Sequence, residues 1–283
     1  MPELLPVKGN HYLWTYVPSL PAAATFTLLF AVATVWVIYR TLKTRTWFSI
    51  PFVVGGLFEV VGYVARIVAR SHTNKKAPFI VQTILILVAP ALFAASIYMT
   101  LGRLIRNVRG EKYSVIPVRW LTTIFVSGDV LSFLVQSAGG GFLANSNANP
   151  KIGQNFILVG LFIQVIMFGV FAIVAIILHV RLRRSSSLAP VPWGKTMVML
   201  YLVSGAIMFR SLFRVTAYIM GTTGYLLRNE WPFYAFDAMP MTVTMVIYAF
   251  WYPSKSVVAE AKWNNEQINL AMPLNGTATD SGV

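Results

Sequence analysis

The pattern of hydrophobic and polar positions divides most of the chain into seven long apolar segments separated by short basic ones. An α-helix rises about 1.5 Å per residue, so about 20 residues cross a hydrocarbon core roughly 30 Å thick. The spans predicted on this basis are Leu20 to Tyr39, Trp47 to Val68, Phe79 to Leu101, Trp120 to Gly141, Phe156 to Val180, Met197 to Gly221 and Phe233 to Tyr252. We therefore expect an all-α integral membrane protein built as a seven-transmembrane helix bundle.

Composition agrees with a lipid environment. Of the 283 residues, 57% are hydrophobic and only 11% are charged, whereas a water-soluble chain carries about 25% charged residues. The segments outside the spans are too short to bury a core of their own. The expected organisation is an N-terminal segment (1–19), one transmembrane domain (20–253) and a C-terminal tail (254–283). The tail is expected to form either a short interfacial helix followed by disorder or disorder throughout.

The basic residues predict the orientation. Fourteen lysines and arginines fall on the side of the odd-numbered loops and the C-terminus, against six on the side of the N-terminus. By the positive-inside rule, the N-terminus is extracellular and the C-terminus cytosolic. The formal net charge of +14 is then explained by contact with anionic lipid headgroups, and no nucleic-acid partner is expected.

Several chemistries are disfavoured by the residues present. The chain has no cysteine, so it has no disulfide and no thiolate site. Its three histidines, His11, His72 and His179, lie in different regions, which argues against a zinc centre. No phosphate-binding loop motif occurs, and no predicted span contains a lysine for a retinal Schiff base. We therefore predict no catalytic residue, no metal, no cofactor and no enzymatic activity.

Polar side chains within the spans are the most informative residues, because an ionised group at the bilayer centre costs about 2.5 to 3.5 kcal/mol. The candidate ligand-binding residues are Glu59, Tyr63, Arg66, Gln82, Asp129, Gln136, Gln164, Arg210, Arg214 and Asp237. Counted by helical rise, Glu59 and Asp129 lie near mid-membrane and the other charged and amide side chains in the outer half. The inner half is expected to be almost purely apolar.

Two interpretations of this polar layer remain open. The layer is either a set of structural ion pairs that fix helix packing or a polar cavity that opens toward the outer leaflet. In both, Asp129 is expected to share a network with Glu59, Arg66 and the two sixth-span arginines. Pro90 and Pro240 are expected to kink or open their helices, and the glycines at 139–141 to form a flexible exit from the fourth span.

Five runs of sequence resemble one known family. They are FEVVGYVARI (58–67), LVAPALFAASIYMTLGRLI (87–105), FVSGDVLSFLVQSAGGG (125–141), GLFIQ (160–164) and RSLFR (210–214). They are similar to the fungal RTA-like family of lipid-translocating exporters, named for resistance to aminocholesterol. The chain departs from that family at Ala217, where a glutamate is usual, and at Tyr252, where a histidine is usual.

The resemblance implies a function and a location. It implies a multi-pass protein, most typically of the fungal plasma membrane, that translocates sphingoid long-chain bases or related toxic amphiphiles, with a membrane lipid or other amphiphile as its ligand. Two alternatives remain: a seven-helix lipid or drug sensor that signals through basic cytosolic loops, and a transporter of porphyrin or haem. The oligomeric state is not predicted.

Overall fold

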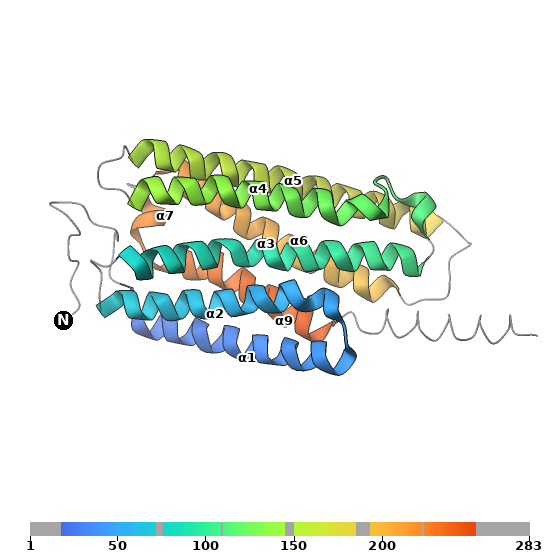
Figure 1. The fold of residues 1–283 in the computed structure, drawn as a ribbon, viewed down its shortest axis with the longest axis horizontal. Coiled ribbons are helices and arrows are strands. Elements are labelled where there is room, and N and C mark those ends of the chain that lie inside the picture. The colour runs from blue at the N-terminus through green and yellow to red at the C-terminus, as the bar shows by residue number, and fades with distance from the viewer. Residues whose placement is uncertain are drawn as a thin grey trace, which may run out of the picture.

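The computed structural model describes residues 18–71, 76–108, 110–144, 150–184, 193–221 and 224–252, and its regular elements there are all helical (Figure 1). In chain order they are α1 (Leu20–Thr44), η1 (Trp47–Ser49), α2 (Ile50–Ser71), α3 (Lys76–Asn107), η2 (Glu111–Tyr113), α4 (Val118–Ala144), α5 (Pro150–Arg184), α6 (Trp193–Ile219), α7 (Tyr225–Arg228), α8 (Trp231–Phe233), η3 (Tyr234–Ala238) and α9 (Met239–Phe250). Consecutive long helices pack side by side from α1 to α6, and α9 closes the bundle by contacting both α6 and α1.

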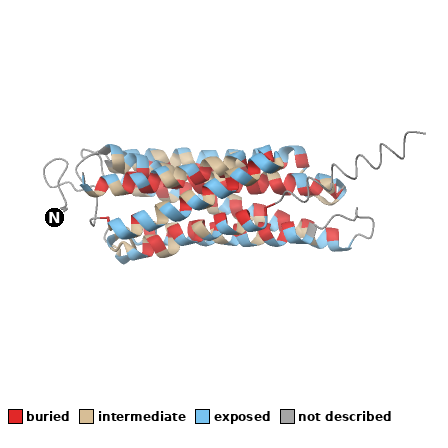
Figure 2. Cartoon of the chain, turned by 90° about the horizontal axis from the view of Figure 1, so that it is seen from below, coloured by how far each residue is buried: buried red, intermediate tan, exposed pale blue. Residues whose placement is uncertain are grey.

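Seven helices of the described chain are long and apolar enough to cross a membrane, one for each predicted span. Large apolar side chains cover the outside of the bundle; Phe250, for example, is 81% exposed. Figure 2 shows this distribution, with exposed positions on the outer helix faces and buried ones turned inward. The expected fold class is confirmed: the chain is a multi-pass, all-helical integral membrane protein.

Two spans exceed their predicted length the most. The helix α3 has 32 residues and α5 has 35, which at about 1.5 Å per residue makes α5 about 50 Å long. Because a hydrocarbon core is roughly 30 Å thick, the ends of α5 extend well beyond it. Its last turn carries Arg181, Arg183 and Arg184, as expected for a segment in the basic interfacial region.

The seventh span is not one continuous α-helix. It begins with α8, passes through η3, which is one turn of π-helix, and continues as α9. Pro240 stands at the start of α9 and cannot donate a backbone hydrogen bond, so the carbonyl four residues earlier loses its usual donor. The expected local opening at Pro240 is thus found just before it, and the widened turn carries Asp237.

The glycines at the end of the fourth span do not form the flexible exit that was expected. The helix α4 continues through them to Ala144. A Cβ atom built on Gly139 would lie 2.6 Å from the carbonyl oxygen of Gly153 in α5, and one on Gly160 would lie 2.8 Å from the carbonyl oxygen of Ser132. These glycines let the two helix backbones approach closely, a recognised mode of helix packing in membranes.

We refer to the end of the bundle that holds Ser19, Ser71 and Gly221 as the outer end, following the predicted orientation. The opposite, inner half is not purely apolar, contrary to the expectation. The hydroxyl of Tyr252 is hydrogen-bonded to Thr41 at 3.0 Å, to Ser49 at 3.0 Å and to Thr46, and Tyr248 is bonded to Ser49 at 2.7 Å. Short hydroxyl side chains escape hydropathy counting, yet here they join α1, η1 and α9. Tyr252, which replaces the family's histidine, therefore has a packing role.

Candidate functional site

Arg66 anchors the outermost polar cluster. Its Nη2 lies 2.8 Å from Glu230 Oε1, and its Nε donates to the Tyr234 hydroxyl at 3.0 Å. Glu230 also accepts the backbone N–H of Ser19 at 2.9 Å. One carboxylate thereby joins the start of α1, the outer end of α2 and the start of the seventh span. Arg66 does not pair with Glu59, although the two lie on one helix.

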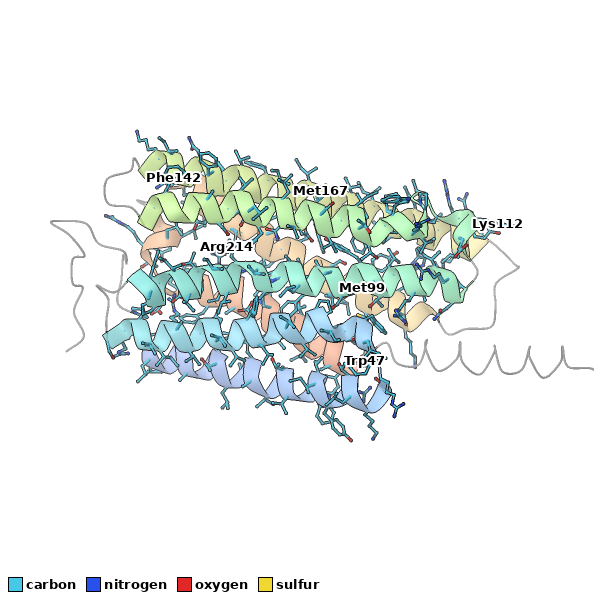
Figure 3. All side chains as sticks on the ribbon, viewed as in Figure 1. Trp47, Met99, Lys112, Phe142, Met167 and Arg214 are labelled. Atoms are coloured by element: carbon cyan, nitrogen blue, oxygen red, sulfur yellow. The ribbon has the colours of Figure 1, made fainter. Side chains whose placement is uncertain are left out.

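Asp237 pairs with both arginines of the sixth span. Arg214 donates to its two oxygens at 2.7 Å each, and Arg210 Nε lies 2.9 Å from Oδ1. All three groups are buried or nearly so. The side chain of Arg214 points into the bundle, nearer the end marked by Phe142 than the end marked by Lys112 (Figure 3). Asp237 is therefore the partner that Arg214 takes in place of the carboxylate missing at Ala217.

Pro90 gives Arg210 a second partner. In an α-helix the N–H of residue 90 would bond the carbonyl of residue 86, but proline has no N–H to donate. The Ile86 carbonyl oxygen instead accepts Arg210 Nη2 at 2.8 Å. A proline in α3 thus prepares an acceptor for a guanidinium on α6. The kink expected at Pro90 stays a prediction, since α3 continues through this residue as one helix.

Glu59 and Tyr63 complete the layer from α2. Glu59 is 1% exposed, its Oε1 has no hydrogen-bond partner among the described residues, and Arg210, Asp237 and Arg214 act on it electrostatically. The Tyr63 ring stacks on Phe30 at 5.3 Å between centroids. We refer to the buried set as the arginine layer; it consists of Glu59, Tyr63, Arg66, Arg210, Arg214, Glu230, Tyr234 and Asp237. Its three arginines face three carboxylates.

Asp129 does not belong to this layer, and its expected pairing with the arginines was wrong. It accepts a hydrogen bond from Tyr98 of α3 at 3.0 Å, and the ion pairs of Arg66, Arg210 and Arg214 are made to other carboxylates. The prediction failed because depth in the membrane was inferred without the rotation of each helix. Asp129 lies near the right depth but on a face turned toward α3 and α5.

Gln136 and Gln164 meet between α4 and α5. Gln136 Nε2 donates to Ser132 Oγ at 2.6 Å and to Gln164 Oε1 at 3.3 Å, and Ser132 in turn donates to the Gly160 carbonyl at 2.7 Å. The Oε1 of Gln136 is buried with no hydrogen-bond partner in the described chain. Gln82 on α3 is also buried, and its Oε1 likewise has no hydrogen-bond partner among the described residues. The sequence thus predicted buried amides correctly but did not predict which of them would meet.

A groove of about 110 Å³ lies between α3 and α4 in the outer half of the bundle. Its α3 wall, within residues 79–87, is mainly aliphatic and aromatic, and its α4 wall holds Gln136, Ser137 and Gly140. Tyr218 of α6, which interacts electrostatically with Arg214, also lines it. The groove is therefore apolar over most of its surface, with a few polar groups on one side and the arginine layer behind Tyr218.

The ten predicted residues therefore fall into distinct places. Six of them are in the arginine layer, Gln136 and Gln164 are at the α4–α5 contact, and Asp129 and Gln82 are elsewhere. Glu230 was not predicted as a site residue, because hydropathy places it in an outer loop. A usable signal exists: it is the carboxylate directly before the seventh span. In the described part of the chain, no three His, Asp or Glu side chains group as metal ligands would.

Residues 52–260 match the family model described as RTA1 like protein. The chain belongs to the RTA1-like family. The resemblance stated from the five sequence runs is confirmed.

Three proteins of Saccharomyces cerevisiae are similar to this chain over most of its length. The chain is 40% identical to Protoporphyrin uptake protein 1 over 216 residues, and this aligned region covers 75% of this chain and 71% of that protein. It is 39% identical over 221 residues to Protein RTM1, covering 74% and 69% respectively. It is 25% identical over 293 residues to the sphingoid long-chain base transporter RSB1, covering 89% and 76%. No solved structure matches the chain.

Two of these three relatives have names that describe uptake or transport. RSB1 is named for a single-chain amphiphile and Protoporphyrin uptake protein 1 for a flat macrocycle. Family membership thus points to membrane transport of lipid-like substances as the general activity of this group. The expectation that the chain is not an enzyme remains a prediction.

Proposed function

We propose that this protein translocates a single-chain amphiphile and that the groove between α3 and α4 holds the ligand's tail. The observation that carries the proposal is the groove itself: it lies in the outer half of the bundle, its walls are mainly apolar, and most of its polar side chains are on the α4 and α6 sides. An alkyl chain is stabilised by apolar walls at roughly 0.8 kcal/mol per buried methylene. Its polar head then lies against Gln136, Ser137 and Tyr218.

The polar groups favour a head that donates hydrogen bonds. Gln136 Oε1 and Ser137 Oγ are buried acceptors with no hydrogen-bond partner among the described residues. The arginines behind Tyr218 are compensated by carboxylates, so they have little unmatched charge for an anionic head. A sphingoid long-chain base carries an amine and hydroxyls on one long chain, which matches an apolar groove with two unused acceptors at its polar side. The name of the relative RSB1 agrees with this choice.

The predicted site residues take two roles in this proposal. Gln136, held by Gln164, contacts the ligand head, while the arginine layer, with Glu59 and Tyr63, forms the polar wall next to it. Gln82 of α3 is proposed to add a polar group to the same wall.

The protein is proposed to act in the plasma membrane, with residues 1–19 outside, the 20–253 bundle in the bilayer, and residues 254–283 in the cytosol beside anionic headgroups. Residues 1–17 and 253–283 lie outside the described residues.

The test fills the groove without disturbing the fold. A Cβ atom on Gly140 meets nothing within 4 Å, so Gly140→Leu is accommodated locally and its side chain extends into the groove. Gly205 on α6 is equally open and lies outside the groove residues, which makes Gly205→Leu the matched control. Wild type and both variants are reconstituted in vesicles, and movement of a fluorescent sphingoid base between leaflets is followed.

We expect Gly140→Leu to lose most of the movement and Gly205→Leu to keep it. Equal transport by both variants would show that the groove does not hold the tail.

A parallel assay with protoporphyrin tests the second candidate function, porphyrin transport, which the 40% identity to Protoporphyrin uptake protein 1 favours. Saturable binding of the base without any movement would support the sensor instead. A reporter fused after Val283 that proved extracellular would contradict the orientation.

A further inference from the structure

Asp129 is the buried carboxylate that the arginine layer leaves out. It lies on α4 and is 4% exposed. The Tyr98 hydroxyl donates to its Oδ2 at 3.0 Å, while Oδ1 is buried without a hydrogen-bond partner among the described residues. One carboxylate oxygen in the middle of the bundle is therefore unused by the fold.

The tyrosine that binds Asp129 lies in an aromatic cluster, and no charged side chain of the described residues acts on Asp129. From α3, Tyr98 is the titratable group that acts on it within the described chain. On its own helix, Phe125 lies one turn away and packs on Tyr98 at 5.3 Å between ring centroids. From α5, Phe168 and Phe171 pack on the same tyrosine ring at 6.1 and 4.5 Å. Charge compensation of the kind that Asp237 receives from two arginines is thus missing here.

This environment does not support an ionised carboxylate. An ionised aspartate at bilayer depth costs several kcal/mol unless it is paired, whereas the neutral acid avoids most of that cost. We propose that Asp129 is a proton-binding site, protonated on Oδ1 in this conformation, and that its proton release and uptake drive transport by this protein. The coupling to transport rests on the proposed function, whereas the proton site does not.

Polar side chains on one face of α4 lie between Asp129 and the groove. Asp129, Ser132 and Gln136 are spaced i, i+3 and i+7, which places them on one face of α4. Gln136 lines the groove and lies about 10 Å from Asp129 along the helix axis. In the cycle, a proton from water on one side bonds to Oδ1, and the same proton later returns to water on the other side. The carboxylate is thereby regenerated, and no other reactant is consumed.

The first experiment detects the proton directly. The infrared spectrum of the purified full-length wild-type protein at neutral pH should contain the carbonyl stretch of a protonated carboxylic acid. The difference between this spectrum and that of Asp129→Asn should show that the variant lacks this band. Glu59→Gln is the matched control, since Glu59 is a second buried carboxylate and its removal should leave the Asp129 band in place. In Tyr98→Phe the band should shift, because the one hydrogen bond to Oδ2 is lost. A wild-type spectrum without the band at neutral pH overturns the proposal, as does a band that disappears on addition of sodium.

The second experiment tests the coupling in vesicles with and without an imposed pH gradient. We expect the gradient to stimulate movement of the labelled base by wild type, a protonophore to abolish the stimulation, and Asp129→Asn to have none. If wild-type transport is indifferent to the gradient, the coupling is wrong even when the infrared band is present. If wild type moves no base at all, the proposed function fails, and the infrared result still decides the proton site.

Discussion

The two sides of this bundle bury polar groups in opposite ways. Between α2, α6 and the seventh span, three arginines are ion-paired with Glu230 and Asp237 at 2.7 to 2.9 Å, and Glu59 is the one carboxylate of this layer that has an oxygen without a hydrogen-bond partner among the described residues. On the α3–α4–α5 side, amides and one carboxylate have oxygens without hydrogen-bond partners in the described part of the chain, although the residues are equally buried. A matched set stabilises one arrangement, whereas unused acceptors are available to a ligand or a proton. Function is therefore better sought where the fold leaves polar atoms unused than where charges are most numerous.

The largest expected effect comes from removing the shared partner of the arginine layer. Asp237→Asn leaves Arg210 and Arg214 facing an amide, so we expect the free energy of unfolding to fall by about 3 to 5 kcal/mol. Asp129→Asn should cost less than about 1 kcal/mol, because the amide oxygen still accepts the Tyr98 hydrogen bond. Chemical unfolding in mild detergent measures both, and equal losses would erase the distinction between the two sides.

A second effect concerns the close contact of α4 and α5. Gly139→Val places side-chain atoms against the Gly153 carbonyl, so the helices must separate, at a cost of about 1 to 3 kcal/mol. Gly141→Val is the control on the same helix, because a Cβ atom there meets nothing within 4 Å. Thermal unfolding of the two variants should differ clearly. Identical midpoints would mean that the two helices can separate freely.

A smaller effect is expected at the outer edge of the arginine layer. Glu230 is 17% exposed in its side chain, so water partly replaces its contacts, and Glu230→Gln should cost about 1 kcal/mol. If Arg66 and Glu230 act as a pair, the double variant with Arg66→Met should lose less than the sum of the single losses. Strict additivity in this double-mutant cycle would show that the ion pair contributes nothing.

The smallest effect tests the contact between a proline and an arginine. In Pro90→Ala the new N–H can bond the Ile86 carbonyl, which Arg210 then loses as an acceptor. Since one hydrogen bond replaces another, stability should change by only about 0.5 kcal/mol. The informative measurement is the cost of Arg210→Met, which should be lower in the Pro90→Ala background. An unchanged cost would show that the Ile86 carbonyl matters little to Arg210.

Hydropathy predicted the spans well, because each needs only a long apolar run, and lipid imposes that requirement locally. The pairing of the polar residues could not be predicted in the same way. Glu230 and Asp129 show why: the first belongs to the layer although it lies in a predicted loop, and the second does not although it lies at the expected depth. Both outcomes depend on how each helix is rotated about its axis, which is set by packing between segments far apart in the sequence. Short hydroxyl side chains such as Thr41 and Ser49 gave no signal, because they hardly change the hydropathy of a span.

The close contact of α4 and α5 also has a consequence for how the chain assembles during synthesis. Ser132 and Gly160 are only 28 positions apart, whereas Arg66 and Glu230 are separated by 164 and Ser19 and Glu230 by 211. Closing a longer loop costs more chain entropy, and the seventh span must be synthesised before Glu230 can bind anything. We therefore expect the α4–α5 hairpin to associate early, as a preassembled unit, and the arginine layer to form as the last step. Until then, Arg66 has no carboxylate from the seventh span, which makes the half-synthesised protein the state most exposed to quality control.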